Sequence, residues 1–346
     1  MSQPKISLIG IDIAKHVFQI QAVDAAGTPI LQKRVRRMAL LETLSRVPAC
    51  IVAMEACATA HHWAREITAL GHVVKLIAPQ YVKPFVKTNK NDAADAGAIC
   101  EAALRPTMRF VPAKTREQQS LAMLHKTRDL LIRQRTSLAV ALRSHLAEFG
   151  IISAQGIRNG IKAAQAISMG EYNDLPELVK EVVEVLHHQL QDLNARIQVL
   201  ESRILAWHRQ SPMSRRLATI PGVGPIIATA IVALVGDPGQ FKSARQFAAW
   251  LGLVPRQMSS GGKERLGSIS KRGNPYLRRL LIVGNRSTLR WLRSRPADGS
   301  AWLMSLLDRK PINVVATAMA NKTARIIWAV MTRKVNYIPP AYRTVA

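Results

Sequence analysis

Four carboxylates early in the chain occupy positions where strands and a helix can bring them together. Asp12 lies near the end of an apolar run over residues 6–13, and Glu55 follows a second run over residues 51–54. Such runs are typical of buried strands. Asp92 and Asp95 are three residues apart, which places both on one face of a helix. Clustered carboxylates need cations, and their hard oxygens suit Mg²⁺ or Mn²⁺, so the pattern indicates metal-assisted chemistry on a phosphodiester.

Each of these acids also has a purely structural interpretation. An acid at a strand end is usually solvated or caps the following helix, and Asp92 fits a helix N-cap with Asp95 in the first turn. The structural interpretation suits any one acid taken alone. All four together, in the order strand, strand, helix, favour the metal site.

The net charge indicates a polyanionic partner. The 346 residues include 49 Lys and Arg against 22 Asp and Glu. Residues 1–115 hold 15 basic and 8 acidic residues, residues 116–210 hold 12 and 10, and residues 211–346 hold 22 and 4. Phosphate backbones and anionic membranes attract such charge. Because the chain has no run of about 18 uncharged apolar residues and no signal-peptide pattern, we expect nucleic acid as the partner and no membrane.

The three cysteines carry little functional information. Cys50, Cys57 and Cys100 lie in apolar contexts and lack the paired spacing of a zinc site. We interpret them as core thiols in a reducing cytoplasm.

Residues 1–115 show the element order of a ribonuclease-H-like α/β domain. Runs over residues 17–23 and 29–35 follow the first strand, which predicts a three-strand antiparallel meander. A helix over residues 38–46 leads to the Glu55 strand, a helix over 60–70 follows, and residues 72–77 make a fifth strand. In that order the first and fourth strands lie side by side, so Asp12 and Glu55 converge, and the Asp92 helix reaches the same edge.

Residues 116–210 form a second, helical region. Residues 118–149 and 175–208 are charge-mixed and carry apolar residues at three- and four-residue steps, which predicts two long helices. Residues 150–174 are rich in Gly, Ala and Ser and predict a loop or a broken helix. The pair of helices fits either a hairpin that packs on its own domain or a coiled-coil dimerisation arm.

Residues 211–346 form a third region, which is mainly helical and strongly basic. Gly222 and Gly224 lie in a turn before an apolar helix over residues 226–234. A Gly-x-Gly turn between helices lets backbone amides approach a phosphate, as in helix-hairpin-helix modules. A plain helix-helix turn is the alternative, but the surrounding positive charge favours phosphate binding.

Two further parts of this region carry cations. Residues 250–265 lead into residues 269–274, a stretch read as a loop full of Gly, Ser and cations. A helix over residues 275–293 is predicted to place four arginines on one face. No acid shares that face, which fits phosphate contact better than a solvated surface. The expected nucleic-acid contacts, besides the two glycines, are Arg256, Lys263, Arg265, Lys271, Arg272, Arg279, Arg286, Arg290 and Arg293. A helix over residues 314–331 is expected to close the core.

Three motifs resemble the DEDD, Holliday-junction-resolvase-like domain of insertion-sequence transposases of the IS110 and IS1111 groups. They are residues 10–15 (GIDIAK), 54–56 (MEA) and 90–96 (KNDAADA), and the later motifs of that family follow in the expected order. Ala58 stands where the family often has Gly, and Asn91 where it often has Thr. Neither departure removes a carboxylate.

The resemblance implies a function and a role for each residue. Asp12, Glu55, Asp92 and Asp95 would hold Mg²⁺ or Mn²⁺, and Ser260 matches the nucleophilic serine, with Ser259 as its rival. The protein would be a bacterial, cytoplasmic enzyme, associated with the nucleoid when it acts. It would cut and exchange strands of donor and target DNA under guidance of a noncoding bridge RNA. The resemblance also implies a homo-oligomer, dimer or tetramer, that builds its site from two protomers.

Two other functions account for part of the sequence. A metal-dependent junction resolvase or nuclease with water as nucleophile uses the four acids and the charge but leaves the serine loop without a role. A non-catalytic RNA- or DNA-binding protein accounts for the charge alone. A covalent protein–DNA adduct would separate the first hypothesis from both.

Overall fold

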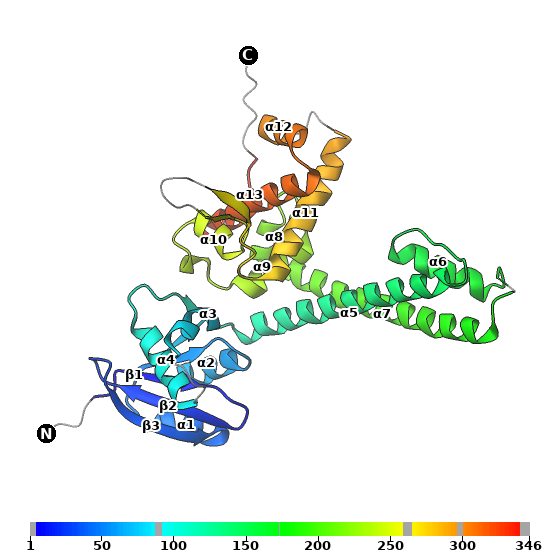
Figure 1. Cartoon of the computed structure of the whole chain (residues 1–346). Coiled ribbons are helices and arrows are strands. Elements are labelled where there is room, and N and C mark those ends of the chain that lie inside the picture. The colour runs from blue at the N-terminus through cyan, green and yellow to red at the C-terminus, as the bar shows by residue number, and fades with distance from the viewer. Residues whose placement is uncertain (1–4, 87–91, 173, 259–264, 296–299, 340–346) are drawn as a thin grey trace, which may run out of the picture. The chain divides into compact units, whose positions relative to one another are not determined.

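The computed structural model divides into two compact units, Met1–Glu117 and Gln118–Ala346 (Figure 1). It describes residues 5–86, 92–172, 174–258, 265–295 and 300–339, with only the backbone of residues 92 and 93. The predicted division at residues 115 and 210 remains a prediction, since the helical region and the basic region belong to one compact unit.

The first unit is built on a six-stranded sheet in the order β3-β2-β1-β4-β5-β6. Strands β1 and β4 are parallel neighbours, and β2 and β3 complete an antiparallel meander beside β1. This mixed sheet is consistent with the expected ribonuclease-H-like order, and the short β6 adds an antiparallel edge beside β5. The strands are β1 (Leu8–Asp12), β2 (Val17–Val23), β3 (Pro29–Arg36), β4 (Ile51–Glu55), β5 (Val73–Ile77) and β6 (Phe110–Val111).

Helices cover both faces of this sheet because its strands are apolar on both sides. Residues such as Ile11 and Met54 pack with α1 and α2 on one face, whereas Leu8 and Ala53 pack with α3 and α4 on the other. Each face therefore has its own core. The helices are α1 (Leu40–Ser45), α2 (Ala60–Ala69), α3 (Pro79–Val82) and α4 (Asp92–Leu104).

Three helices form the predicted helical region. The long helices α5 (Arg116–Ala147) and α7 (Glu177–Gln210) lie side by side, with α6 (Ile157–Ser168) beside them (Figure 1). Arg128 on α5 pairs with Glu201 on α7, and Leu142 and Leu190 share one buried cluster with α6. Residues 150–174, predicted to be a loop or a broken helix, thus contain a helix. Its Ile157, Ile161, Ala164 and Ile167 recur at helical spacing, a signal that the Gly and Ala content concealed.

The remaining helices of the second unit enclose its largest core. The buried residues of α9, α11 and α13 form this core, and a two-stranded hairpin, β7–β8, joins α10 to α11. Helix α11 has the predicted bounds, and Asn274 caps it by accepting hydrogen bonds from the backbone of Tyr276 and Leu277. The elements are α8 (Pro212–Leu217), α9 (Pro225–Val235), α10 (Ala244–Trp250), β7 (Pro255–Gln257), β8 (Leu266–Ile269), α11 (Pro275–Arg293), α12 (Ala301–Arg309) and α13 (Ile312–Arg333).

Across the described residues, every helix is too short or too polar to cross a bilayer.

Candidate active site

Strand pleating directs the first two carboxylates to the same face of the sheet. Side chains alternate along a strand, so Asp12 shares the side of Leu8, and Glu55 shares the side of Ala53. Leu8 and Ala53 both belong to the core under α4. The parallel register places Ile11 opposite Met54, which brings the ends of β1 and β4, and with them both acids, to one edge. The predicted strand order therefore brings two of the four acids together.

A glycine in β1 lets α4 approach closely enough to present Asp95. A Cβ atom on Gly10 would lie 2.6 Å from the Ala96 carbonyl oxygen and 2.5 Å from Cys100 Sγ. Both contacts are on α4, where Ala96 directly follows Asp95 and Cys100 lies five residues after it, so the missing side chain sets the distance between the helix and the strand. Sequence reasoning did not assign this role to Gly10. A glycine between isoleucines in an apolar strand is the signal that could have found it.

The electrostatics of Glu55 show that three of the acids share one neighbourhood. Partial burial, and then the negative charges of Asp12 and Asp95, raise the pKa of Glu55 above its usual value. Burial, with the charges of Glu55 and Asp12, also raises the pKa of the Cys57 thiol, although its own backbone hydrogen bond opposes this. Like charges raise a carboxyl pKa only over short distances. The edge therefore holds excess negative charge.

The acidic edge, meaning Asp12, Glu55, Asp92 and Asp95, offers the oxygen donors that Mg²⁺ or Mn²⁺ prefers. Asp92 begins α4, but its side chain lies outside the described residues. In the described part of the chain, no three His, Cys, Asp or Glu side chains converge as metal ligands. The donor chemistry nevertheless fits a divalent cation, because burial and then the charges of Asp12 and Asp95 raise the Glu55 pKa, and a cation relieves the repulsion among these acids.

A polar pocket of about 300 Å³ adjoins Asp12. Lys15, His16 and Arg34 line it together with Asp12. Cations beside an acid give the pocket a mixed charge, which suits a phosphate held next to a carboxylate-bound metal. Sequence reasoning missed this group, because Arg34 comes from β3 and reaches Asp12 only through strand pairing.

The predicted nucleophile and its rival, Ser260 and Ser259, lie outside the described residues, as does Lys263. The flanking chain forms the hairpin β7–β8, and the Met258 amide donates to the Arg265 carbonyl at 2.8 Å. Arg256 is exposed on β7. The serine loop is therefore closed at its base by a short antiparallel ladder.

The Gly-Val-Gly turn lines a separate pocket of about 610 Å³, together with Arg128 of α5 and residues of α9 and α11. Gly222 has φ +80°, and a Cβ there would lie 3.0 Å from Thr288 Oγ1, so this glycine serves the packing of the turn on α11. A Cβ on Gly224 would meet nothing within 4 Å. Open space at Gly224 leaves room for a phosphate, while the helix-hairpin-helix function stays a prediction.

The expected cationic face of α11 is divided by an ion pair. Arg279 pairs with Asp129 of α5, which uses one of the four arginines within the unit. Arg286, Arg290 and Arg293 are exposed. Lys271 and Arg272, just before the helix, are also exposed. The available cations therefore lie toward the C-terminal half of α11 and in the preceding loop.

Comparison with known proteins covers most of the chain. Residues 9–151 match the family named DEDD_Tnp_IS110 and described as "Transposase", and residues 214–298 match the "Transposase IS116/IS110/IS902 family". A "Probable family 20 transposase" of Pseudomonas aeruginosa is 48% identical over 96% of this chain and 99% of its own length. The "Transposase for insertion sequence element IS1328" of Yersinia enterocolitica is 43% identical over 95% of this chain and 98% of its own length.

A third relative is the "Transposase for insertion sequence element IS1111A" of Coxiella burnetii, which is 42% identical over 97% of this chain and 92% of its own length. Identity at this level over nearly the full length of both proteins extends to activity as well as fold. The chain belongs to the IS116/IS110/IS902 family of insertion-sequence transposases, enzymes that cleave DNA strands and transfer them.

Proposed function

We propose that this transposase uses the acidic edge as a metal site and Ser260 as its nucleophile. The observation that carries the proposal is the meeting of the β1 and β4 ends at one edge under α4, where burial and then the charges of Asp12 and Asp95 raise the Glu55 pKa. An enzyme of DNA strand cleavage needs the charge of the scissile phosphate and of the leaving oxygen to be neutralised. A carboxylate cluster in a chain of net charge +27 serves that need through a divalent cation.

In the proposed reaction, Ser260 Oγ attacks a DNA phosphorus atom. The Oγ–phosphorus bond forms as a phosphorus–sugar oxygen bond breaks, the serine loses its proton, and the sugar oxygen gains one. The hydroxyl of the exchanged strand then reverses the step and releases the serine. A divalent cation held by Asp12, Glu55, Asp92 and Asp95 would supply Lewis acidity for serine ionisation and for the leaving oxygen.

We further propose that the enzyme acts as a homo-oligomer on donor and target DNA under guidance of a noncoding RNA. The resemblance of the three acidic motifs to RNA-guided recombinases supports this. The exposed cations Arg256, Lys271, Arg272 and Arg286 suit backbone contacts, which carry no sequence information themselves. Base pairing by a guide would then supply target choice.

Adduct trapping tests the serine. Protein co-expressed with its own element is mixed with labelled donor and target DNA and denatured, and covalently labelled protein is measured. We expect wild-type protein and Ser259→Ala to form the adduct and Ser260→Ala to form none. An adduct that persists in Ser260→Ala and vanishes in Ser259→Ala would assign the nucleophile to Ser259. Strand cleavage without any adduct would point to water as the nucleophile, as in a junction resolvase.

Two further measurements test the metal and the guide. Asp12→Ala should abolish recombination while the protein still co-purifies with RNA, because the acidic edge acts on the DNA phosphate. Sequencing the co-purified RNA should return transcripts of the element itself. Full recombination by Asp12→Ala would refute the metal role. A divalent cation that neither binds nor changes activity would favour the non-catalytic nucleic-acid-binding protein, in which the acids are structural.

A further inference from the structure

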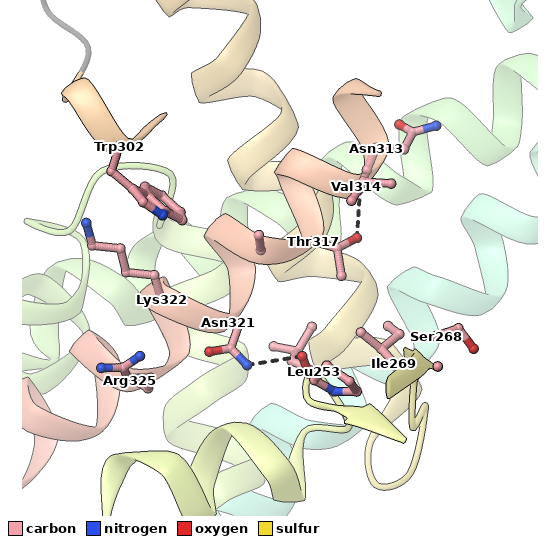
Figure 2. Close-up of a pocket in the computed structure, with 13 residues that line it drawn as sticks. Leu253, Ser268, Ile269, Trp302, Asn313, Val314, Thr317, Asn321, Lys322 and Arg325 are labelled. Carbon is pink, nitrogen blue, oxygen red and sulfur yellow. Dashed lines mark hydrogen bonds between the residues drawn. The ribbon is translucent and has the colours of Figure 1, made fainter. Parts of the chain in front are cut away.

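A largely apolar pocket of about 820 Å³ lies at the base of the hairpin that carries the serine loop. Pro255 and Ile269, from β7 and β8, form one wall, and α13 forms another from Asn313 to Arg325 (Figure 2). At 1.5 Å per residue this helical wall is about 18 Å long. The volume falls within the range of small-ligand sites, roughly 300–1,000 Å³.

An exposed aromatic ring and two cations mark one end of this pocket. Trp302 of α12 is 46% exposed, and Lys322 Nζ lies 4.9 Å from the centre of its ring. Arg325 lies one turn further along α13, on the same side (Figure 2). Among the described residues that line the pocket there is no Asp or Glu. A flat ring beside cations, without opposing acids, is the combination that holds a base and its phosphate.

Asn321 adds an oriented polar group to the apolar floor. Its Nδ2 donates to the Leu253 carbonyl at 3.0 Å, which fixes the amide plane. The amide oxygen is turned toward the side of Lys322 and Arg325 (Figure 2). Because Leu253 lies two residues before the start of β7, the same hydrogen bond ties α13 to the base of the serine hairpin. A fixed acceptor in an apolar pocket can accept a hydrogen bond from a base edge.

From these contacts we infer that the pocket binds one unpaired nucleotide of the DNA strand next to the cleavage point. The base lies against Trp302 with an edge toward Asn321, and its phosphate lies between Lys322 and Arg325. DNA is the favoured occupant because the pocket wall is the hairpin whose loop contains Ser260, the proposed attacking group. The position of the nucleotide next to the cleavage point rests on the proposed function of Ser260. The chemistry of the ligand does not, because it follows from the Trp302 ring, the Asn321 amide and the two cations.

The experiment uses the full-length protein and oligonucleotides that carry 5-iododeoxyuridine, which cross-links to stacked aromatic rings. Affinity is measured by fluorescence anisotropy for single-stranded DNA, for the corresponding duplex and for RNA of the same sequence. We expect Trp302→Ala to weaken single-stranded DNA binding about tenfold and duplex binding less than twofold. Trp302→Phe keeps a ring and should retain most of the affinity. Mass spectrometry should find the cross-link on Trp302.

Trp291→Ala is the matched control. Trp291 is 48% exposed and also lies beside a cation, with Arg295 Cζ 5.3 Å from its ring centre, but it lies on α11 and does not line the pocket. This variant should bind single-stranded DNA as the wild type does. Circular dichroism and thermal unfolding verify that each variant folds. If Trp302→Ala does not fold, the affinity of Trp302→Phe for single-stranded DNA is compared with that of the wild type instead.

Four results would overturn the inference. The first is that Trp302→Ala loses as much affinity for duplex as for single-stranded DNA, and the second is that Trp291→Ala loses as much single-strand affinity as Trp302→Ala. The third is that Trp302→Ala weakens the binding of RNA alone. The fourth is that Trp302→Ala changes the oligomeric mass without an effect on DNA binding, which would assign the pocket to a second copy of the chain. The adduct assay separates this inference from the proposed function. If the covalent adduct forms and Trp302→Ala binds single-stranded DNA normally, only the proposed role of the pocket is rejected. If DNA cross-links to Trp302 but no protein variant forms the adduct, only the serine chemistry is rejected.

Discussion

The acidic edge of the first unit and the cationic surface of the second are organised in opposite ways. Four of the 8 acids of residues 1–115 belong to the acidic edge, whereas residues 211–346 hold 22 basic residues and 4 acids. Asp12, Glu55 and Asp95 come near one another through strand pairing and one close helix contact, and burial together with the charges of Asp12 and Asp95 raises the Glu55 pKa. Arg286, Arg290 and Arg293 of α11 are spread along a helix and are exposed. Concentrated charge suits a metal, and spread charge suits a polymer backbone.

This difference has a consequence for sensitivity to mutation. A cluster that depends on long-range contacts should fail when a single contact is lost. A surface of separate cations should lose affinity in small steps, since each phosphate contact contributes on its own.

The largest effect is expected for Asp95→Asn, which removes one donor of the acidic edge without changing its size. We expect the rate of DNA cleavage to fall at least about a hundredfold. Residues that only hydrogen-bond to a metal ligand typically contribute roughly 10- to 100-fold to activity, and a direct ligand should contribute at least as much. Cleavage is measured against Mg²⁺ concentration. Asp24→Asn is the control, since Asp24 accepts hydrogen bonds from Ala26 and Thr28 in a turn of the same unit. Equal activity of both variants would remove Asp95 from the metal site.

The next effect tests how α4 is placed. Gly10→Ala puts a methyl group against the Ala96 carbonyl and Cys100 Sγ of α4, and it should lower the free energy of unfolding by about 1–3 kcal/mol and reduce cleavage. Gly97→Ala on α4 meets only the Gln21 side-chain amide, at 3.2 Å, and should be close to neutral. Chemical denaturation measures both variants. If Gly10→Ala were as stable and as active as Gly97→Ala, the close approach would have no role.

A third prediction concerns a buried histidine in the second unit. The ring nitrogens of His125 lie 3.0 Å from the Tyr276 hydroxyl and 3.0 Å from Thr229 Oγ1, and burial, with Arg128 nearby, lowers its pKa from 6.5 to about 4. The depressed pKa stabilises the fold above pH 6.5, and this contribution is lost as the pH falls toward 4. His125→Gln should cost about 1–3 kcal/mol at pH 7 and flatten the pH dependence of unfolding.

His188→Gln is the control for this histidine, because His188 is exposed on α7. It should change the pH dependence of unfolding less than His125→Gln does. An identical flattening in both variants would show that the pH dependence arises elsewhere.

The smallest effect is expected for Glu55→Gln in the absence of divalent cations. A carboxyl with a raised pKa stabilises the folded state below its ordinary pKa of 4.5, and that contribution is lost as the pH rises through the raised value. At neutral pH the ionised Glu55 is therefore unfavourable, and Glu55→Gln should raise the melting temperature by roughly 1–3 °C. Added Mg²⁺ should stabilise the wild type more than the variant. A lower melting temperature for Glu55→Gln would contradict the proposed repulsion.

Much of the local structure follows from the sequence because it depends on neighbouring residues. The strands β2 and β4 and the helix α11 begin and end where apolar runs and caps predict. The segment that contains α6 was expected to be a loop or a broken helix, because its Gly and Ala content competes with its periodicity. Competing local signals of similar strength leave the outcome to tertiary packing.

The candidate site divides in the same way. The identity of the four acids, their order and the concentration of positive charge after residue 211 are properties of the sequence alone. Only the tertiary structure decided that Gly10 admits α4, that Arg34 reaches the Asp12 pocket, that Asp129 engages Arg279, and that Trp302 stands beside the serine hairpin. Local patterns act over a few residues, whereas these contacts join segments far apart in the chain, and packing selects them only when the whole core forms.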